Sequence, residues 1–300
     1  MSHFRTFGFV VFRGLLSGAE IDRLTDEATY ALANAYGAAF DENTSGVAEL
    51  PALDLPMMTG ETPFATSLVA DDPRFWQASH ELLGTATVPG NGEVTCFLGA
   101  NARWHADLPA AVTGVKFMVY LQKCSREAGQ LQVLPGSHRP ELGAMYADFL
   151  RQDPARQGLA PADFPVPAYG IDTEPGDVIA FHANLLHASV GGDRRMLWDV
   201  YYLPDPILRG HEERVLTRDA LLHVGDYGGV AFDHDKWTAW RDWVSAAGES
   251  DARSTAVTRL RRLGVLDVPG ADIGAPQWQP RLPKPSMTGT AGAPPMHRES

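Results

Sequence analysis

The sequence predicts a mainly β protein with flanking helices, in which the strands form an antiparallel barrel or sandwich. From about residue 93 to residue 203, short apolar runs alternate with turns that contain Gly, Pro or Asp. This spacing is typical of antiparallel strands, whereas βαβ units would place a helical segment after each strand. On both sides of this region, apolar residues recur three or four positions apart, as they do in amphipathic helices. A chain of 300 residues is long enough to bury such a core.

The N-terminal part is expected to contain one strand and two helices. Ser17 and Glu20 match a capping box, in which each of the two side chains accepts a hydrogen bond from a free amide at the start of a helix. Phe and Val dominate the segment before this box, and Gly, Pro and acidic residues dominate a segment after it. The expected elements are a strand over 7–16, a helix over 18–36, loops over 37–63 and a helix over 73–84.

The central region supplies the remaining strands. The apolar runs that predict them cover 93–99, 112–122, 129–134, 176–182, 185–190 and 195–203. One helix is expected between strands, at 141–151, and helical spacing returns after residue 204, for example at Ala256, Leu260 and Leu263. We interpret 1–267 as a single domain with a β-core at about 93–204, and 268–300 as a Pro- and Gly-rich tail whose end is expected to be disordered.

Composition and charge exclude several classes of protein. The net charge is −12 and no long Lys/Arg cluster occurs, so a nucleic-acid partner is not expected. No apolar run approaches the roughly 20 residues that a membrane helix needs, and the N-terminus lacks the pattern of a secretory signal. The two cysteines, Cys96 and Cys124, suit a reducing compartment. We therefore expect a cytoplasmic protein with a small-molecule ligand; the oligomeric state stays open.

Three residues have the types and spacing of metal ligands. His105 and Asp107 are two positions apart, so on a strand their side chains point to the same face. His187 follows the turn at 175–177 and an apolar strand, and it supplies a second imidazole. Two histidines and one carboxylate on one face of a metal leave three coordination positions open, which is the arrangement that non-haem Fe(II) oxygenases use.

An arginine pair follows the third candidate ligand. Arg194 and Arg195 open an otherwise apolar strand, where a guanidinium is expected to bind an anion. A guanidinium grips a carboxylate with two parallel hydrogen bonds, and the distal carboxylate of 2-oxoglutarate is the natural partner beside an iron site. Ser189 shares a strand face with His187 and can donate a further hydrogen bond. We favour Arg195 for this role and keep Arg194 as the alternative.

The sequence resembles the phytanoyl-CoA dioxygenase-like (PhyH) branch of the Fe(II)/2-oxoglutarate-dependent oxygenases. The resemblance covers roughly residues 5–205, and its pieces occur in the same order as in the family. They are FGFVV at 7–11, WHAD at 104–107, GQLQVLPGSH at 129–138, GD at 176–177, FH at 181–182, LHAS at 186–189 and then Arg195. The loop between His187 and the arginine pair is shorter than is usual in the family, which is why both arginines stay candidates.

The resemblance implies a fold, a reaction and roles for residues. The fold is a double-stranded β-helix, also called a jelly roll or cupin-like fold. The reaction is the oxidation of a small molecule by O₂ and 2-oxoglutarate, most simply hydroxylation of an unactivated C–H bond with release of succinate and CO₂. Desaturation, epimerisation and ring formation are also known in the family. His105, Asp107 and His187 would hold iron, and Arg195 with Ser189 would bind the cosubstrate.

Substrate identity cannot be read from the sequence. Trp104 and Trp198 are pocket candidates because they neighbour expected site positions, and Asn101 is a third candidate. A natural-product precursor in secondary metabolism is one substrate class that the resemblance suggests. Two alternatives remain, namely a cupin-type metalloenzyme that does not use 2-oxoglutarate, and a non-catalytic jelly-roll binding protein.

Overall fold

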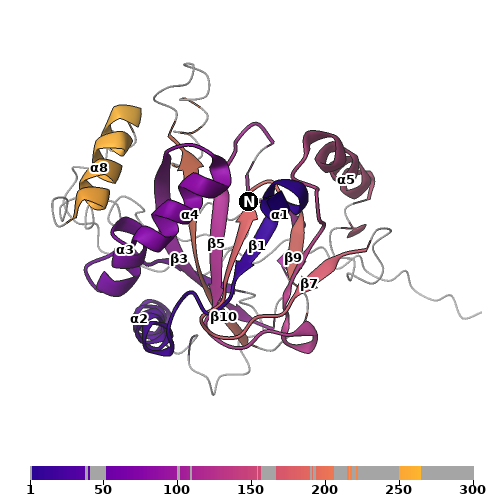
Figure 1. The fold of residues 1–300 in the computed structure, drawn as a ribbon. Coiled ribbons are helices and arrows are strands. Elements are labelled where there is room, and N and C mark those ends of the chain that lie inside the picture. The colour runs from indigo at the N-terminus through magenta and orange to yellow at the C-terminus, as the bar shows by residue number, and fades with distance from the viewer. Residues whose placement is uncertain are drawn as a thin grey trace, which may run out of the picture.

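In the computed structural model, two antiparallel β-sheets face each other and helices lie outside them (Figure 1). The structure describes residues 2–37, 40, 52–99, 102–108, 110–153, 155–156, 167–189, 191, 194–205, 215, 217, 221 and 250–264. The tail at 268–300 lies outside these residues.

Within the described residues, one sheet has six strands and the other has four. In spatial order, the larger sheet contains β1 (Phe9–Phe12), β8 (Val178–His182), β5 (Val115–Tyr120), β10 (Arg194–Pro204), β3 (Thr87–Leu98) and β2 (Ala52–Pro56). The smaller sheet contains β4 (Ala102–His105), β9 (His187–Ser189), β6 (Leu131–Val133) and β7 (Tyr169–Ile171). Neighbouring strands are antiparallel. This arrangement is a jelly roll, and the predicted fold class is confirmed.

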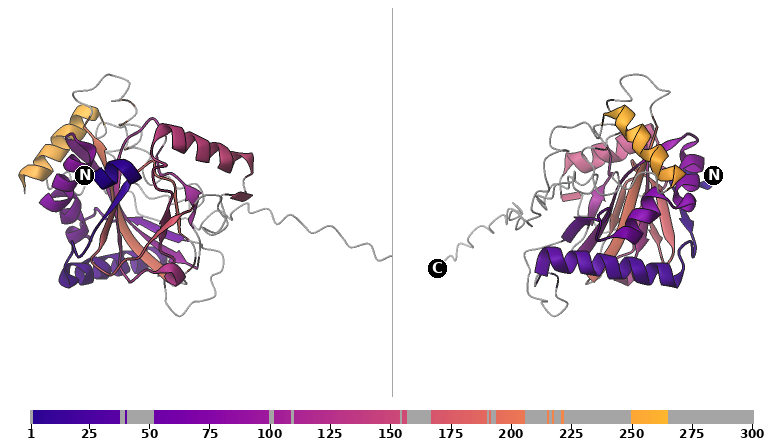
Figure 2. Two further views of the ribbon diagram at one scale, coloured as in Figure 1. Left: turned by 45° about the vertical axis from the view of Figure 1, so that its right-hand side comes forward. Right: turned by 90° about the vertical axis from the view of Figure 1, so that its left-hand side faces the viewer.

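The helices cover the outer faces of the two sheets. They are α1 (Ser2–Phe7), α2 (Gly18–Tyr36), α3 (Pro63–Ala70), α4 (Pro73–Leu83), α5 (Pro140–Gln152) and α8 (Asp251–Leu263), and a short 3₁₀ turn, η2, spans Arg126–Ala128. Figure 2 shows α2, α3, α4 and α8 on the side of the larger sheet and α5 apart from them. None of the described helices is both long and apolar enough to span a membrane.

Four helices agree with the sequence prediction, and their ends have physical causes. In α2 the capping box forms, because the Ser17 amide donates to Glu20 Oε2 at 2.7 Å while the Ser17 hydroxyl accepts from the Glu20 amide. Gly84 ends α4 in the left-handed conformation, with φ of 68°, which costs glycine little. Helices α5 and α8 also match expected segments.

Other elements differ from the prediction. Segment 52–56, expected as loop, forms β2 because it pairs with β3, and α3 begins at Pro63, where the expected loop ends. The expected strand over 7–16 is shorter, since helix α1 includes Phe7 and β1 ends at Phe12. Strand β3 begins six residues before the expected run, and β7 was not expected.

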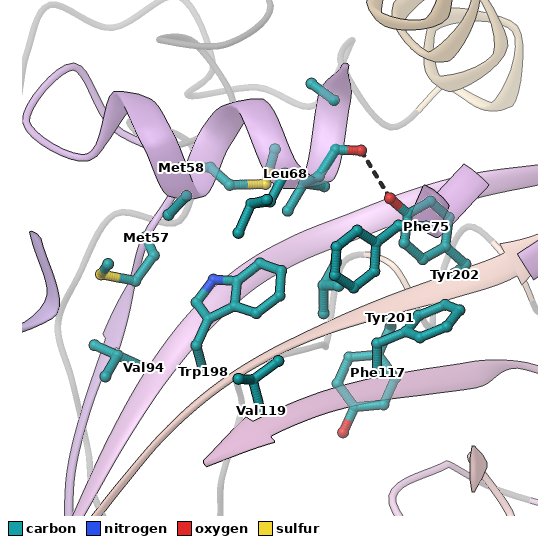
Figure 3. Packing of buried hydrophobic residues seen from close by; sticks show 14 of the residues in the cluster. Met57, Met58, Leu68, Phe75, Val94, Phe117, Val119, Trp198, Tyr201 and Tyr202 are labelled. Atoms are coloured by element: carbon teal, nitrogen blue, oxygen red, sulfur yellow. Dashed lines mark hydrogen bonds between the residues drawn. The ribbon is translucent and has the colours of Figure 1, made fainter. Parts of the chain in front are cut away.

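The larger sheet separates two apolar cores. On β10, Trp198, Val200 and Tyr202 pack under the helices, whereas Leu197 packs between the sheets. Figure 3 shows Trp198 among residues of the helix-side core such as Phe75. The rings of Phe75 and Trp198 pack edge to face, with their centroids 5.7 Å apart. Because neighbouring residues of a strand point to opposite faces, every second residue of β5 and of the regular part of β3 and β10 faces the space between the sheets; the pairing of β3 with β10 is irregular between Val200 and Tyr202.

Candidate metal centre

The structure brings together the three candidate metal ligands from segments far apart in the sequence. His105 ends β4, Asp107 lies two residues later, and His187 begins β9, directly opposite His105 in the strand register. The two imidazole rings have centroids 4.2 Å apart. Asp107 Oδ1 lies 3.4 Å from His105 Nε2 and 3.6 Å from His187 Nε2. One ligand atom from each residue therefore lies within 4.8 Å of the others.

The donor set fits a metal ion. Both carboxylate oxygens of Asp107 are buried and have no hydrogen-bond partner among the described residues, an arrangement that is costly unless a cation binds there. His105 Nδ1 lies 2.6 Å from the Arg103 carbonyl oxygen, and His187 Nδ1 lies 2.9 Å from that of Leu185. Such contacts fix the proton on Nδ1 and leave Nε2 to bind a metal.

The protonation states of His187 and Asp107 also suit metal binding. Burial lowers the pKa of His187 to about 3, so its imidazole is neutral near pH 7. Burial alone would raise the pKa of Asp107, but the Lys116 ammonium and the two imidazoles together lower this pKa well below its usual value. A neutral imidazole and an ionised carboxylate are the forms in which these side chains coordinate metals.

Arg195 lies in the interior, between the two sheets. Only 1% of the residue is exposed, and its guanidinium lies over the Phe97 ring at 4.7 Å from the ring centroid. It donates a hydrogen bond to the Gly191 carbonyl oxygen. It also lies directly against Gly129, so closely that a Cβ atom at residue 129 would overlap with it. A buried cation in this position is suited to hold an anion that enters between the sheets.

Ser189 adjoins the same place. Its hydroxyl donates to the Gly129 carbonyl oxygen at 2.7 Å, so Ser189 and Arg195 contact the same glycine. Sequence reasoning missed Tyr120 on β5, which is buried beside both residues. Burial is the main cause that raises the pKa of Tyr120 to about 12. The hydrogen bond with Ser189 and the charge of Arg195 each lower this pKa, but by less. The alternation along the predicted strand at 112–122 could have placed Tyr120 on the inner face.

Arg194 points elsewhere. Its guanidinium donates to the Phe40 carbonyl oxygen at 3.0 Å and lies over the Phe40 ring, 4.5 Å from its centroid. Consecutive strand residues point to opposite faces, so Arg194 and Arg195 cannot both reach the space between the sheets. Of the two arginines, the structure places Arg195 there.

The pocket candidates do not lie as expected. Trp104 is buried outside the smaller sheet with Leu134, Leu150 and Leu186, and Trp198 lies in the helix-side core. Each neighbours an inward-facing residue by one position and therefore points away from the metal centre. The structure thus packs both tryptophans in apolar cores, whereas the sequence predicted them beside the site. Asn101 lies outside the described residues.

Sequence reasoning also missed charged residues on the inner face of the larger sheet. Lys116 of β5 contacts the carboxylates of Asp199 and Asp107, with Nζ–Oδ2 distances of 3.2 and 3.9 Å. Glu93 of β3 lies directly opposite Asp199. The predicted runs at 93–99, 112–122 and 195–203 contain Glu93, Lys116 and Asp199 respectively, but these runs were interpreted by their apolar content alone.

Several solved structures share this fold. The epimerase SnoN from nogalamycin biosynthesis, described as non-haem and α-ketoglutarate-dependent, is 19% identical, with a TM-score of 0.52 over 68% of this chain and 81% of its own. HygX from Streptomyces hygroscopicus, solved with nickel and 2-oxoglutarate bound, is 18% identical, with a TM-score of 0.51 over 67% and 84%. The carbocyclase SnoK, also from nogalamycin biosynthesis, is 18% identical, with a TM-score of 0.52 over 68% and 82%.

These identities indicate a shared fold. A search of curated protein sequences gave no match. The model of one family, phytanoyl-CoA dioxygenase (PhyH), matches residues 4–196, which include the triad and Arg195. Iron and 2-oxoglutarate, the two cofactors expected from the sequence, are both named in solved structures that share this fold. The match covers well over half of the chain, and the chain therefore belongs to the phytanoyl-CoA dioxygenase family.

Proposed function

We propose that the protein is an Fe(II)- and 2-oxoglutarate-dependent dioxygenase that oxidises a small organic molecule. The observation that carries the proposal is the convergence of His105, Asp107 and His187, with both oxygens of the buried Asp107 carboxylate lacking a hydrogen-bond partner in the part of the chain that the structure describes. A buried Arg195 between the same two sheets supplies the second requirement, a site for an anionic cosubstrate.

Each residue has a distinct task in this proposal. The triad would bind iron through His105 Nε2, His187 Nε2 and an Asp107 oxygen, and these three ligands leave three positions open. Arg195 and Ser189 would bind the distal carboxylate of 2-oxoglutarate. When bound, iron and 2-oxoglutarate supply the activation of O₂, and 2-oxoglutarate is converted to succinate and CO₂. Apolar side chains between the sheets, such as Phe181 with its ring centroid 4.8 Å from that of His187, would limit the access of water to the reacting atoms.

The chemical outcome that we propose is hydroxylation of an unactivated C–H bond, in a natural-product precursor or a similar small molecule. Two of the similar structures are an epimerase and a carbocyclase, both from nogalamycin biosynthesis. Enzymes with this fold thus include ones whose named reaction is not hydroxylation. The mass of the product separates them, because hydroxylation adds one oxygen atom, epimerisation leaves the mass unchanged, and ring closure or desaturation removes two hydrogen atoms.

The test is an anaerobic titration of the full chain with Fe(II) and 2-oxoglutarate. The proposal predicts a weak visible absorption band from the complex of the two ligands, and slow succinate release when air is admitted. The His187→Ala variant should lose both signals. The matched control is His80→Ala, because His80 lies on helix α4, outside the larger sheet, and its removal should leave both signals intact.

Other outcomes would overturn the proposal in different ways. Metal binding without the absorption band and without succinate would favour a cupin-type metalloenzyme that does not use 2-oxoglutarate. Failure of the wild-type chain to bind a divalent metal would favour a non-catalytic binding protein. Persistence of the band in His187→Ala would remove the triad from the mechanism.

A further inference from the structure

A group of buried charged residues lies on the inner face of the larger sheet, and the proposed chemistry gives it no role. Asp54 of β2, Glu93 of β3, Lys116 of β5 and Asp199 of β10 have exposed fractions of 8%, 5%, 4% and 2%. Charged side chains are almost never buried to this extent unless they are paired. Here three carboxylates face one ammonium, so pairing within the group is incomplete.

The strand register adds to this excess of negative charge by placing two carboxylates side by side. Glu93 and Asp199 lie directly opposite each other on neighbouring strands, an arrangement of like charges that destabilises a sheet. Lys116 contacts Asp199 Oδ2, but Asp199 Oδ1 is buried without a hydrogen-bond partner among the described residues. Burial, followed by the charges of Asp199 and Asp54, raises the pKa of Glu93 well above its usual value.

The group adjoins the candidate metal centre. Lys116 Nζ lies 3.2 Å from Asp199 and 3.9 Å from Asp107, so one lysine connects the carboxylates to a candidate iron ligand. With Fe(II) and 2-oxoglutarate in the proposed positions, the described residues of this region set four carboxylates and a dianion against Fe(II), Lys116 and Arg195. An excess of two negative charges remains, or of one if Glu93 keeps its proton. A neutral or anionic substrate would leave this excess uncompensated.

We propose that Glu93 and Asp199 bind a cationic nitrogen of the substrate, such as a protonated amine, beside the iron. This inference rests on the proposed function and narrows its substrate class. Asp54, on the adjacent strand, adds attraction for the same cation. The oxidised C–H bond then belongs to the part of the substrate near this nitrogen, since Lys116 links the cation site to Asp107.

Two other occupants fit the observations less well. A second metal ion would need several carboxylate oxygens to converge, but among the described residues only His105, Asp107 and His187 bring three donor atoms within 4.8 Å. A substrate carboxylate would need the Lys116 ammonium, which already contacts the carboxylates of Asp199 and Asp107.

The experiment compares cationic probes with neutral molecules of the same shape. The full chain is loaded with Mn(II) and 2-oxoglutarate, which prevents turnover. Propylammonium, hexylammonium and benzylammonium are titrated against 1-propanol, 1-hexanol and benzyl alcohol. Paramagnetic relaxation of the probe protons by Mn(II) reports both the Kd and the proximity to the metal. We expect at least one ammonium ion to bind about tenfold more tightly than its alcohol, as a charge-assisted hydrogen bond provides.

Variants identify the residues responsible. Glu93→Gln keeps the side-chain shape but removes the charge, and it should abolish the preference for ammonium over alcohol; Asp199→Asn should reduce it. The control is Glu81→Gln, an equal change of charge at an exposed position on α4, which should leave the preference unchanged. Glu93→Gln should also raise the Tm of the metal-free protein, because it removes the unfavourable pair with Asp199.

The outcomes separate the two proposals. If the wild type shows no ammonium preference for any probe, or if the preference survives in both Glu93→Gln and Asp199→Asn, the inference about the substrate is wrong. A lowered Tm of Glu93→Gln with an unchanged preference would assign Glu93 a structural role instead. If the Fe(II)/2-oxoglutarate absorption band is present in these cases, the proposed function stands. If that band is absent from the wild type, both proposals fail.

Discussion

Gly129 meets two requirements that no other residue would meet at once. Its φ of 73° lies in the left-handed region, and a Cβ atom there would overlap with both the Arg195 guanidinium and the Gly191 carbonyl oxygen. Gly129→Ala would therefore push Arg195 away from its position. We predict that this variant weakens 2-oxoglutarate binding at least about tenfold while metal affinity is kept, as measured by anaerobic titration.

Gly84→Ala is the control for Gly129→Ala. Gly84 has a similar φ of 68°, but a Cβ atom there would meet no other atom within 4 Å. Both variants bear the cost of a left-handed alanine, about 1 kcal/mol, so only Gly129→Ala should lose cosubstrate affinity. Equal loss in both variants would show that backbone strain alone causes the effect.

Asp54 makes a pH-dependent contribution to stability. Burial raises the pKa of Asp54 to about 6, against 3.8 in the ordinary state. Between about pH 4 and pH 6 the folded chain keeps the Asp54 proton while the unfolded chain loses it, so rising pH destabilises the fold in this range. We predict that Asp54→Asn gains stability relative to wild type across this range, by up to roughly 2–3 kcal/mol. Urea unfolding of the metal-free proteins at several pH values measures this gain. If the difference in unfolding free energy between Asp54→Asn and wild type does not change with pH, the prediction is contradicted.

At the scale of single residues, the sequence was sufficient where residue type and spacing alone indicate a role. His105, Asp107 and His187 stand out because two histidines and a carboxylate occur at strand spacing near apolar runs. Trp104 and Trp198 were misplaced because proximity in sequence was taken for proximity in space, although side chains one residue apart on a strand face opposite sides. The same alternation would have placed Glu93 and Asp199 on the inner face.

Helix α2 shows how far an element can be predicted from its own residues. Its capping box and its buried stripe are both encoded within 17–36, and the structure reproduces both. We predict that Ser17→Ala lowers the free energy of unfolding by about 1 kcal/mol, since it removes the acceptor for a helix-start amide. Urea denaturation provides the measurement. Thr258→Ala, which removes an exposed hydroxyl inside α8, should change stability little, and an equal loss there would argue against a capping effect.

Elements that depend on distant partners were harder to predict. Segment 52–56 becomes a strand because β3 lies beside it, with Asp54 opposite Thr95, and the Gly- and Pro-rich composition of 37–63 concealed this. Strand β7 has three residues and exists through its pairing with β6. Neither signal is present in a local window of sequence, because tertiary pairing overrides local composition.

At the scale of the whole molecule, the two faces of the larger sheet differ in role. One face packs against the helices, and the other lines the space that contains the candidate site. Val119 packs in the helix-side core and Tyr120, the next residue, lies beside Ser189 and Arg195. We predict that Val119→Ala costs roughly 2 kcal/mol in unfolding free energy and leaves 2-oxoglutarate affinity unchanged. Tyr120→Phe should do the reverse, with a weaker cosubstrate complex and nearly unchanged stability.

Urea unfolding and anaerobic titration, applied to both variants, check this separation. A substitution at Val119 that weakens cosubstrate binding as strongly as Tyr120→Phe would show that the two faces are coupled.

The architecture of the molecule was predictable only in part. Antiparallel strands followed from turn spacing, but the strand order of each sheet did not, and the family resemblance supplied the jelly roll.

The first strand of the sheet is also among the last to acquire a neighbour. Phe9 of β1 pairs with Phe181 of β8, and His105 of β4 pairs with His187 of β9. During synthesis, β1 stays unpaired until β8 has been made, which is nearly two hundred residues into the chain. Such distant pairings slow folding, because the chain loses entropy before the contacts form. The nascent chain accordingly lacks its third candidate iron ligand until His187 of β9 has been made, and β10, which lies between β5 and β3 in the larger sheet, follows later still.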